Sequence, residues 1–207
     1  MNPLDRAFGA LYDQGMRGAE RAGLGDRRRD LLQHLHGHVV EIGAGTGANV
    51  PHVPEAVERL TLLEPMPEMA RRLRARLAHA APSADVEVLD APAEALPLPD
   101  ASADAVVSTL VLCSVEDLER SLDEVCRVLR PGGRLVLIEH VAADGVVGVV
   151  QRTLDPVWRV LVRGCRLHRD TRSAVAAAGF DVSDVRPWRL PGAGPAAPAI
   201  TGVARRP

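Results

Sequence analysis

Three glycines at alternate positions follow a short apolar segment in the first quarter of the chain. The pattern reads Glu41-x-Gly43-x-Gly45-x-Gly47, and residues 39–42 before it are typical of a buried strand. A glycine-rich turn after a strand lets the backbone approach a bound nucleotide closely. The spacing therefore predicts a nucleotide site that includes Glu41, Gly43, Ala44, Gly45 and Gly47.

The spacing differs from that of a dinucleotide site. The dinucleotide fingerprint, G-x-G-x-x-G, places its last glycine one residue later and opens a helix whose amides bind pyrophosphate. Here the corresponding region contains Asn49 and Pro51, and Glu41 adds a negative charge nearby. A nucleoside without phosphate fits these residues better, and S-adenosylmethionine, with its sulfonium cation and amino-acid tail, is such a ligand. A nicotinamide-dependent oxidoreductase and a non-catalytic nucleotide-binding protein are the alternatives from other classes.

A carboxylate follows at the end of the next apolar segment. Glu64 comes directly after residues 60–63, about 20 residues beyond the glycines, where an acidic side chain can accept hydrogen bonds from both ribose hydroxyls. The alternative interpretation is that Glu64 only caps a helix beginning at Pro67. Residues 91–97, 109–115 and 139–140 follow later strand-like segments, so we expect them at the same edge of the sheet.

Apolar runs alternate with helical patterns along most of the chain. We predict strands at residues 39–42, 60–63, 86–89, 105–112, 135–138, 182–187 and 200–204. We predict helices within 5–36, with a break near 23–25, and at 67–80, 115–129, 149–162 and 171–178. This alternation predicts an α/β fold, a mostly parallel seven-stranded sheet with helices on both faces. Aromatic residues make up only 2% of the chain, so the core must be aliphatic.

Length and composition narrow the classes further. The 207 residues suit one domain, which we divide into an N-terminal helical cover (1–37), a cofactor-binding core (38–140) and substrate-side helices with the last two strands (141–207). A net charge of −2 gives no basic footprint, so we expect no nucleic-acid partner. Three cysteines without a paired motif predict neither a disulfide framework nor a metal site. We expect no membrane attachment, a cytoplasmic location, and a monomer or homodimer.

Several motifs together resemble one family. Residues 41–47, Glu64-Pro65 and residues 129–133 resemble the class I S-adenosylmethionine-dependent methyltransferases, which have a Rossmann-like fold. The segments 108–115, 139–141 and 164–171 resemble the methyltransferase-like 7 type thiol methyltransferases. The resemblance covers about residues 39–203. It implies that the sulfonium methyl group is transferred to a small thiol, with S-adenosylhomocysteine as the product.

The resemblance also implies roles for individual residues. Gly43 to Gly47 would hold the methionine tail, Glu64 would hold the ribose, and Met66 would pack on the adenine. Glu94 and the backbone of Ala93 would line the adenine edge, Thr109 and Leu110 would border the sulfonium, and Tyr12 would close the site from the N-terminal cover. Further candidate cofactor-binding residues are Asn49, Pro65 and Ser114. Where many members carry an Asp-Ala pair this chain has Pro92-Ala93, which leaves Asp90 or Glu94 as the substitute carboxylate.

The methyl acceptor is the least determined part of the prediction. A thiol ionises in part at neutral pH, so a catalytic base is optional for S-methylation, whereas an alcohol would need one. The candidate bases are His140 and His168, and the candidate substrate contacts are Cys113, Trp158 and Cys165. An O-, N- or C-methyltransferase acting on a phenol, amine or quinone is the alternative. The arginines at 27–29 are interpreted as a solvated helix face.

Overall fold

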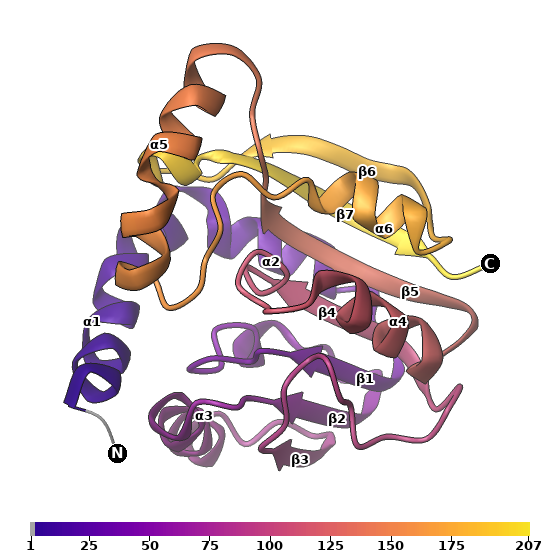
Figure 1. Cartoon of the computed structure of the whole chain (residues 1–207). Coiled ribbons are helices and arrows are strands. Elements are labelled where there is room, and N and C mark those ends of the chain that lie inside the picture. The colour runs from indigo at the N-terminus through magenta and orange to yellow at the C-terminus, as the bar shows by residue number, and fades with distance from the viewer. Residues whose placement is uncertain (1–2) are drawn as a thin grey trace.

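The computed structural model describes residues 3–207, and for residues 3–8 and Ala10 it describes the backbone only (Figure 1). Seven strands form one sheet in the order β3-β2-β1-β4-β5-β7-β6. The strands are β1 (Gly37–Ile42), β2 (Val57–Leu63), β3 (Asp85–Leu89), β4 (Ala103–Thr109), β5 (Leu129–His140), β6 (Asp181–Arg189) and β7 (Pro198–Arg205). Strands β1 to β5 run parallel to one another, and β7 runs antiparallel to both β5 and β6. The predicted fold class is confirmed.

Register in the parallel part brings the ends of β1, β2 and β4 to one edge. Ile42 pairs with Leu63 on one side and with Ser108 on the other. From β1 the chain continues to β2 on one side, and after β3 it returns to β4 on the other side of β1. The connections on the two sides of β1 therefore run in opposite directions. This is the topological switch point, where open α/β sheets bind their ligands beyond the carboxyl ends of the strands.

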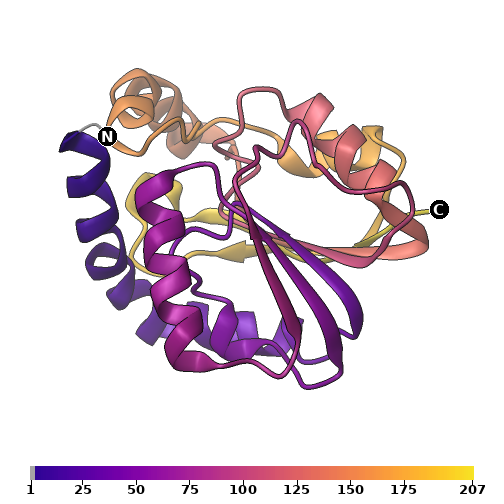
Figure 2. The same ribbon diagram turned by 90° about the horizontal axis from the view of Figure 1, so that it is seen from below.

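Helices cover both faces of the sheet. The helices are α1 (Pro3–Ala19), α2 (Gly25–Leu32), α3 (Pro67–Ala80), α4 (Leu118–Val128), α5 (Gly145–Leu161) and α6 (Thr171–Ala177), with η1 (Glu20–Leu24) between α1 and α2, and short turns η2 (Val50–His52) and η3 (Gly194–Ala196). Figure 1 and Figure 2 show α1 and α5 standing beyond the end of the sheet where β4 and β5 terminate. Among the described residues, no helix is both long enough and apolar enough to cross a lipid bilayer.

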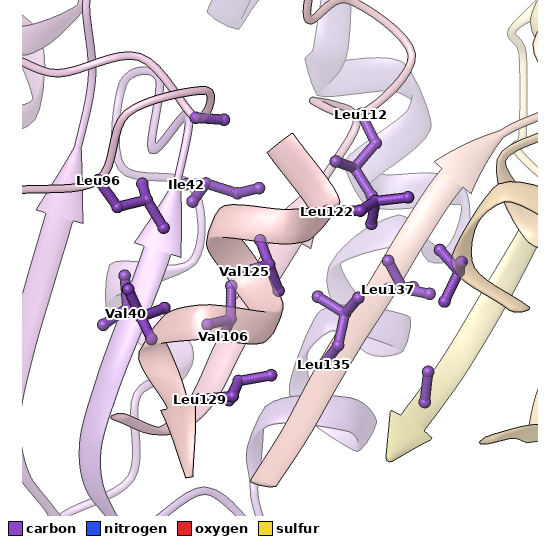
Figure 3. Packing of buried hydrophobic residues seen from close by; sticks show 14 of the residues in the cluster. Val40, Ile42, Leu96, Val106, Leu112, Leu122, Val125, Leu129, Leu135 and Leu137 are labelled. Atoms are coloured by element: carbon purple, nitrogen blue, oxygen red, sulfur yellow. The ribbon is translucent and has the colours of Figure 1, made fainter. Parts of the chain in front are cut away.

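The aliphatic core divides between the two faces of the sheet because successive side chains of a strand point in opposite directions. Val40, Val106 and Leu135 pack with Leu122 and Val125 of α4 on one face (Figure 3). On the other face, Val39, Val107 and Val136 pack with Leu32 of α2 and Leu73 of α3. With both faces covered, the strands carry near-continuous aliphatic runs, as the composition predicts.

Three local predictions are corrected by the structure. The strand predicted to reach residue 112 ends at Thr109, because Leu110 has a φ of 61° and turns the backbone away from the sheet. The helix predicted from residue 115 begins at Leu118, because the Asp117 side chain accepts a hydrogen bond from the Arg120 amide and caps it. The arginine run is not a uniformly solvated face, since Arg28 is buried.

Candidate functional site

A cavity of about 970 Å³ lies beyond the carboxyl ends of the parallel strands. Its floor consists of the loops after β1, β2, β3 and β4 and of the end of β5, and its cover comes from α1, the end of α5 with the segment after it, and the loop between β6 and β7. A smaller hollow of about 500 Å³ lies at the opposite edge, around Gly37, Arg59 and Asp104 at the starts of the strands. Because parallel sheets bind ligands at their carboxyl edge, the larger cavity is the candidate site.

The glycine loop forms one wall of this cavity. Gly43 has a φ of 56°, and a Cβ atom there would lie 2.6 Å from the Cγ1 atom of Val111. Only glycine therefore permits the tight contact between the loop after β1 and the loop after β4. Gly45 also has a positive φ, and a Cβ atom there would meet only the Gly43 carbonyl oxygen, at 3.9 Å. The backbone at Gly45 is thus accessible to a ligand.

Glu64 lines the cavity and is fixed by two backbone amides. Its Oε2 atom accepts a hydrogen bond from the Gly45 amide at 2.7 Å, and its Oε1 atom accepts one from the Met66 amide at 2.8 Å. An ionised carboxylate has about four acceptor positions, so two remain for a ligand. Burial raises the pKa of Glu64, and the two amides oppose this by favouring the charged form. The carboxylate is therefore held in position to accept hydrogen bonds from a diol.

A buried polar network supports the glycine loop from behind. Asn49 donates to Glu41 at 3.0 Å and to Thr109 at 3.1 Å, and it accepts a hydrogen bond from Arg28 at 2.7 Å. Arg28 also pairs with Glu20 at 3.1 Å. Burial raises the pKa of Glu41 to about 7, against the opposing effects of Asn49 and Arg28. None of these five residues lines the cavity, so their contacts position the loop.

The far end of the cavity contains sulfur and aromatic groups. Cys113, His140, Trp158 and Cys165 all line it. The His140 Nε2 atom lies 2.7 Å from the Cys165 sulfur, and the Trp158 indole donates to the same sulfur at 3.2 Å. The two sulfur atoms and the His140 nitrogen lie within 4.8 Å of one another. Sequence spacing does not reveal this cluster, because its members come from the β4–α4 loop, β5, α5 and the segment after α5.

Glu139 fixes the loop that carries Cys113. Its Oε1 atom accepts hydrogen bonds from the Ser108 hydroxyl at 2.7 Å and from the Val111 and Leu112 amides at 2.9 and 3.1 Å. Its Oε2 atom accepts from the Cys113 amide at 3.3 Å. Sequence reasoning gave Glu139 no role of its own. The available signal was its position beside His140 at the end of a buried strand.

Most predicted cofactor residues lie where the prediction requires. The cavity wall includes Tyr12, Gly43, Gly45, Glu64, Pro65, Met66, Ala93, Glu94, Leu110 and Ser114. Burial raises the pKa of Tyr12 to about 12. Glu94 accepts a hydrogen bond from the Glu116 amide at 2.8 Å, which ties the loop after β3 to the start of α4. The assignment of these residues to a bound cofactor stays a prediction.

Other predicted residues lie outside the cavity wall. Glu41, Ala44, Gly47, Asn49 and Thr109 are on or behind the glycine loop, and Asp90 is exposed. His168, one of the two candidate bases, is also outside: its side chain is 49% exposed and its Nδ1 atom lies 3.1 Å from Asp155. The contact with Asp155 holds the His168 ring away from the cavity. His140 is thus the candidate base that the fold brings to the site.

One contact at the N-terminal cover was not anticipated from the sequence. Asp13 of α1 accepts a hydrogen bond from the Thr46 hydroxyl of the glycine loop at 2.5 Å and pairs with Arg76 of α3 at 3.5 Å. It therefore holds α1 over the cavity. The sequence of an amphipathic helix does not show which of its polar residues contacts another element, because the partners of Asp13 lie more than 30 residues away in the chain.

The fold and the cavity define a class of protein. A mostly parallel sheet in this order, with an alternating-glycine loop after β1 and a carboxylate after β2 at the switch point, is that of a class I S-adenosylmethionine-dependent methyltransferase. Residues 40–137 match the family model described as a methyltransferase domain. The predictions of a methyltransferase and of S-adenosylmethionine as its cofactor are confirmed.

Comparison with individual proteins is more specific. Human thiol S-methyltransferase TMT1A is 41% identical over 184 residues, which cover 84% of this chain and 72% of the relative. Human thiol S-methyltransferase TMT1B is 35% identical over 176 residues, covering 80% of this chain and 71% of the relative. The chain belongs to the methyltransferase family that contains these two enzymes.

Solved structures agree on the fold. A Thermotoga maritima S-adenosylmethionine-dependent methyltransferase, described as a possible histamine N-methyltransferase, superposes with a TM-score of 0.71 at 24% identity and covers 100% of both chains. Geranyl diphosphate methyltransferase in complex with S-adenosylmethionine superposes with a TM-score of 0.69 at 14% identity, covering 91% of this chain and 85% of that one. At these identities the likeness concerns the architecture alone.

Proposed function

We propose that the protein methylates the sulfur of a small-molecule thiol. The observation that carries this proposal is the single cavity that joins the glycine loop and Glu64 at one end to Cys113, His140 and Cys165 at the other. Its volume of about 970 Å³ is near the upper end of ordinary ligand pockets, about 300–1,000 Å³, which leaves room for an acceptor beside the nucleoside. The activity named for TMT1A and TMT1B supports the same acceptor class.

The residues of the cavity suit S-adenosylmethionine. Glu64 presents an anchored carboxylate to a ribose diol, the Gly45 backbone leaves space for the amino-acid tail, and Met66 and Ala93 provide an apolar wall for the adenine. When bound, S-adenosylmethionine supplies a methyl group that is already activated by the sulfonium charge. The task of the protein is then to align the acceptor with this group and to keep water out.

The cover of the cavity both aligns the acceptor and keeps water out. Tyr12 and Met16 of α1 and Trp158 and Val162 at the end of α5 line the cavity from the side opposite the sheet. Cys113, Ser114, His140 and Cys165 line the cavity as well, and charged groups are added to its wall by Glu94, Glu116, Asp117, Arg120 and Arg163. The cavity therefore offers both apolar surface and charged groups to an acceptor with one nucleophilic atom.

The test is a methylation assay with two acceptor panels. Purified protein and S-adenosylmethionine are incubated with alkyl and aryl thiols, and in parallel with phenols and amines of matched size. S-adenosylhomocysteine is quantified for each. We expect kcat/KM for the best thiol to exceed that for its oxygen analogue by at least about 100-fold, which is within the range of general acid–base effects. Faster turnover of phenols or amines would contradict the proposal.

The setting of the reaction is part of the proposal. The three cysteines are free in the structure, which is consistent with the reducing, cytoplasmic environment that the sequence predicts. The monomer or homodimer expected from the sequence stays a prediction, as does the expectation that neither nucleic acid nor membrane is a partner.

A further inference from the structure

The Cys165 sulfur is surrounded by hydrogen-bond donors in the wall of the cavity. The Trp158 indole nitrogen, 3.2 Å away, can only donate, so the sulfur accepts this hydrogen bond. The His140 Nε2 atom lies at 2.7 Å, and the Cys113 sulfur belongs to the same cluster. Cys165 itself is buried from bulk solvent but forms part of the cavity wall.

The position of the His140 proton follows from its second nitrogen. The Nδ1 atom is buried, and no described residue offers it a hydrogen-bond partner. A proton on Nδ1 would therefore be a buried donor without an acceptor, which is costly. The imidazole therefore carries a proton on Nε2, directed at Cys165. Hydrogen bonds from two N–H groups favour the ionised form of the sulfur.

The titratable groups around Cys165 act in the same direction. A hydrogen bond from the Cys113 thiol and the contact with His140 lower the pKa of Cys165 to about 5, although burial opposes them. The pKa of Cys113 is raised, because its thiol donates to Cys165 and is itself buried, and Glu139 adds a nearby negative charge. Arg163 lines the cavity two residues before Cys165. These contacts favour a thiolate on Cys165 over one on Cys113.

We propose that the Cys165 thiolate accepts the proton of the acceptor thiol, with His140 and Trp158 as positioning residues. This inference rests on the proposed function. The acceptor S–H bond breaks and its proton forms an S–H bond with Cys165. The electron pair left on the acceptor sulfur forms the bond to the methyl carbon, while the pair of the cleaved donor bond stays on the donor sulfur. Cys165 afterwards releases its proton to water.

The acidity of the acceptor favours thiols. A thiol, of pKa about 8.5, gives up its proton to a given base more readily than a phenol, of pKa about 10, and an aliphatic alcohol is far less acidic than either. The difference between thiol and phenol favours the thiolate by about 30-fold with any base. Cys165 accepts the proton, and the acidity of the acceptor accounts for this part of the preference for thiols.

The distance between His140 and Cys165 is shorter than the distance between two ligands of a tetrahedral zinc ion. Sulfur and nitrogen ligands of a tetrahedral zinc ion lie at about 2.3 and 2.0 Å from the metal, which places them about 3.5 Å from each other. The observed distance between His140 Nε2 and Cys165 Sγ is 2.7 Å. A ligating histidine also usually donates its second N–H to a partner, and no described residue provides one for His140.

The first test measures the ionisation of Cys165 without any turnover. The ultraviolet absorbance of thiolate is titrated in the wild type, in Cys165→Ser and in Cys126→Ser, whose cysteine is partly buried on α4 away from the cavity. We expect the wild type and Cys126→Ser to hold one thiolate at pH 7 and Cys165→Ser to hold none. His140→Gln should move the titration to higher pH. Equal thiolate content at pH 7 in all variants would overturn the proposal, as would stoichiometric zinc in the purified protein.

The second test varies the acidity of the acceptor. Cys165→Ser should lower kcat/KM about 100-fold or more for an alkyl thiol, in line with loss of a general base. An aromatic thiol that is already ionised at neutral pH needs no base, and we expect its loss to be below about 10-fold. With the alkyl thiol, the variant's rate should rise with pH up to the acceptor's own pKa, whereas the wild-type rate should be nearly constant above about pH 6.

The outcomes separate this inference from the function on which it rests. If the wild type methylates thiols and Cys165→Ser loses both acceptors equally, Cys165 has a structural role and only the base assignment fails. If the wild type methylates phenols and no thiol, the proposed function fails and the base assignment fails with it, even if the thiolate is present. Binding of S-adenosylhomocysteine by Cys165→Ser, measured by calorimetry, shows that the variant is folded.

Discussion

At the scale of single residues, the site depends on carboxylates whose partners are mostly backbone amides. Glu64 and Glu139 each accept hydrogen bonds from amides at the ends of strands, so each fixes a loop as well as a charge. In each carboxylate the two oxygens accept hydrogen bonds from different backbone amides. Removal of the carboxylate therefore affects the structure of a loop as well as the charge in the site.

Glu64→Ala should weaken S-adenosylhomocysteine binding by about 1.5–3 kcal/mol, because a charged group that accepts ribose hydrogen bonds is lost. Titration calorimetry measures the change. The control is Glu87→Ala, which removes an exposed carboxylate from β3, outside the cavity. Unchanged affinity in a folded Glu64→Ala protein would show that Glu64 only orders the loop after β2.

Glu41 gives a prediction about stability and pH. Its pKa is about 7 in the folded protein, against an ordinary value of 4.5, because of burial. Between these values the folded state binds a proton that the unfolded chain does not, so the contribution of Glu41 to stability falls as the pH rises. Wild-type stability relative to Glu41→Gln should therefore decrease by on the order of 3 kcal/mol from pH 4.5 to pH 7.

Urea denaturation of both proteins across this pH range measures the difference. Glu87→Gln is the control, because its exposed carboxylate is not in a buried network. Curves for wild type and Glu41→Gln that run parallel between pH 4.5 and pH 7 would mean that Glu41 is ionised throughout, compensated by Arg28.

At the scale of elements, loops from neighbouring strands fix one another. Gly43 of the loop after β1 approaches Val111 of the loop after β4, and the latter loop is bound to Glu139 at the end of β5. The three strands thus position the cavity floor jointly. A substitution in one of these loops should therefore alter the position of the neighbouring loop.

Gly43→Ala should destabilise the protein by about 2–5 kcal/mol, since a left-handed residue costs about 1–2 kcal/mol and the contact with Val111 adds an overpacking cost of about 1–3 kcal/mol. Gly132→Ala is the matched control: its φ is also positive, at 75°, but no atom lies within 4 Å of the added Cβ. It should show only the backbone cost. If chemical denaturation gives equal losses for the two variants, the close approach of the loops is not a constraint.

At the scale of the whole molecule, the cavity lies between the sheet and a separate cover. Asp13 of α1 accepts a hydrogen bond from Thr46 of the glycine loop, which connects the cover to the sheet. The other helix of the cover is α5, on which Val146, Val157 and Val160 are exposed. A ligand held between α1 and the sheet should therefore stabilise the position of α1 relative to the core.

Binding should consequently protect α1 from proteolysis. Arg17 and Arg21 are exposed at the end of α1 and in η1, so trypsin can cleave there when the cover opens. Saturating S-adenosylhomocysteine, at about 100 times its Kd, should stabilise the bound form by about 2.7 kcal/mol and slow this cleavage. NADH at the same concentration is the control and should give no protection. Equal cleavage rates with and without S-adenosylhomocysteine would mean that α1 does not cover the ligand.

The sequence by itself determined the architecture and predicted which residues form the cofactor end of the site. Local periodicity predicts helices and strands, and glycines 43, 45 and 47 with Glu64 are close in sequence to the strand ends that position them. Boundaries were less well determined, since the end of β4 depends on the left-handed backbone at Leu110 and the start of α4 on the cap provided by Asp117.

Only the tertiary structure decided which distant side chains meet. Cys113, His140, Trp158 and Cys165 lie on four segments, and no spacing rule connects them before the sheet order is known. The same holds for Arg28, which reaches Asn49 beneath the glycine loop although its neighbours in the sequence suggest a solvated helix face. The physical reason is that sequence patterns report local backbone preferences and burial, whereas a protonation state or a hydrogen-bond network depends on contacts between segments far apart in the chain.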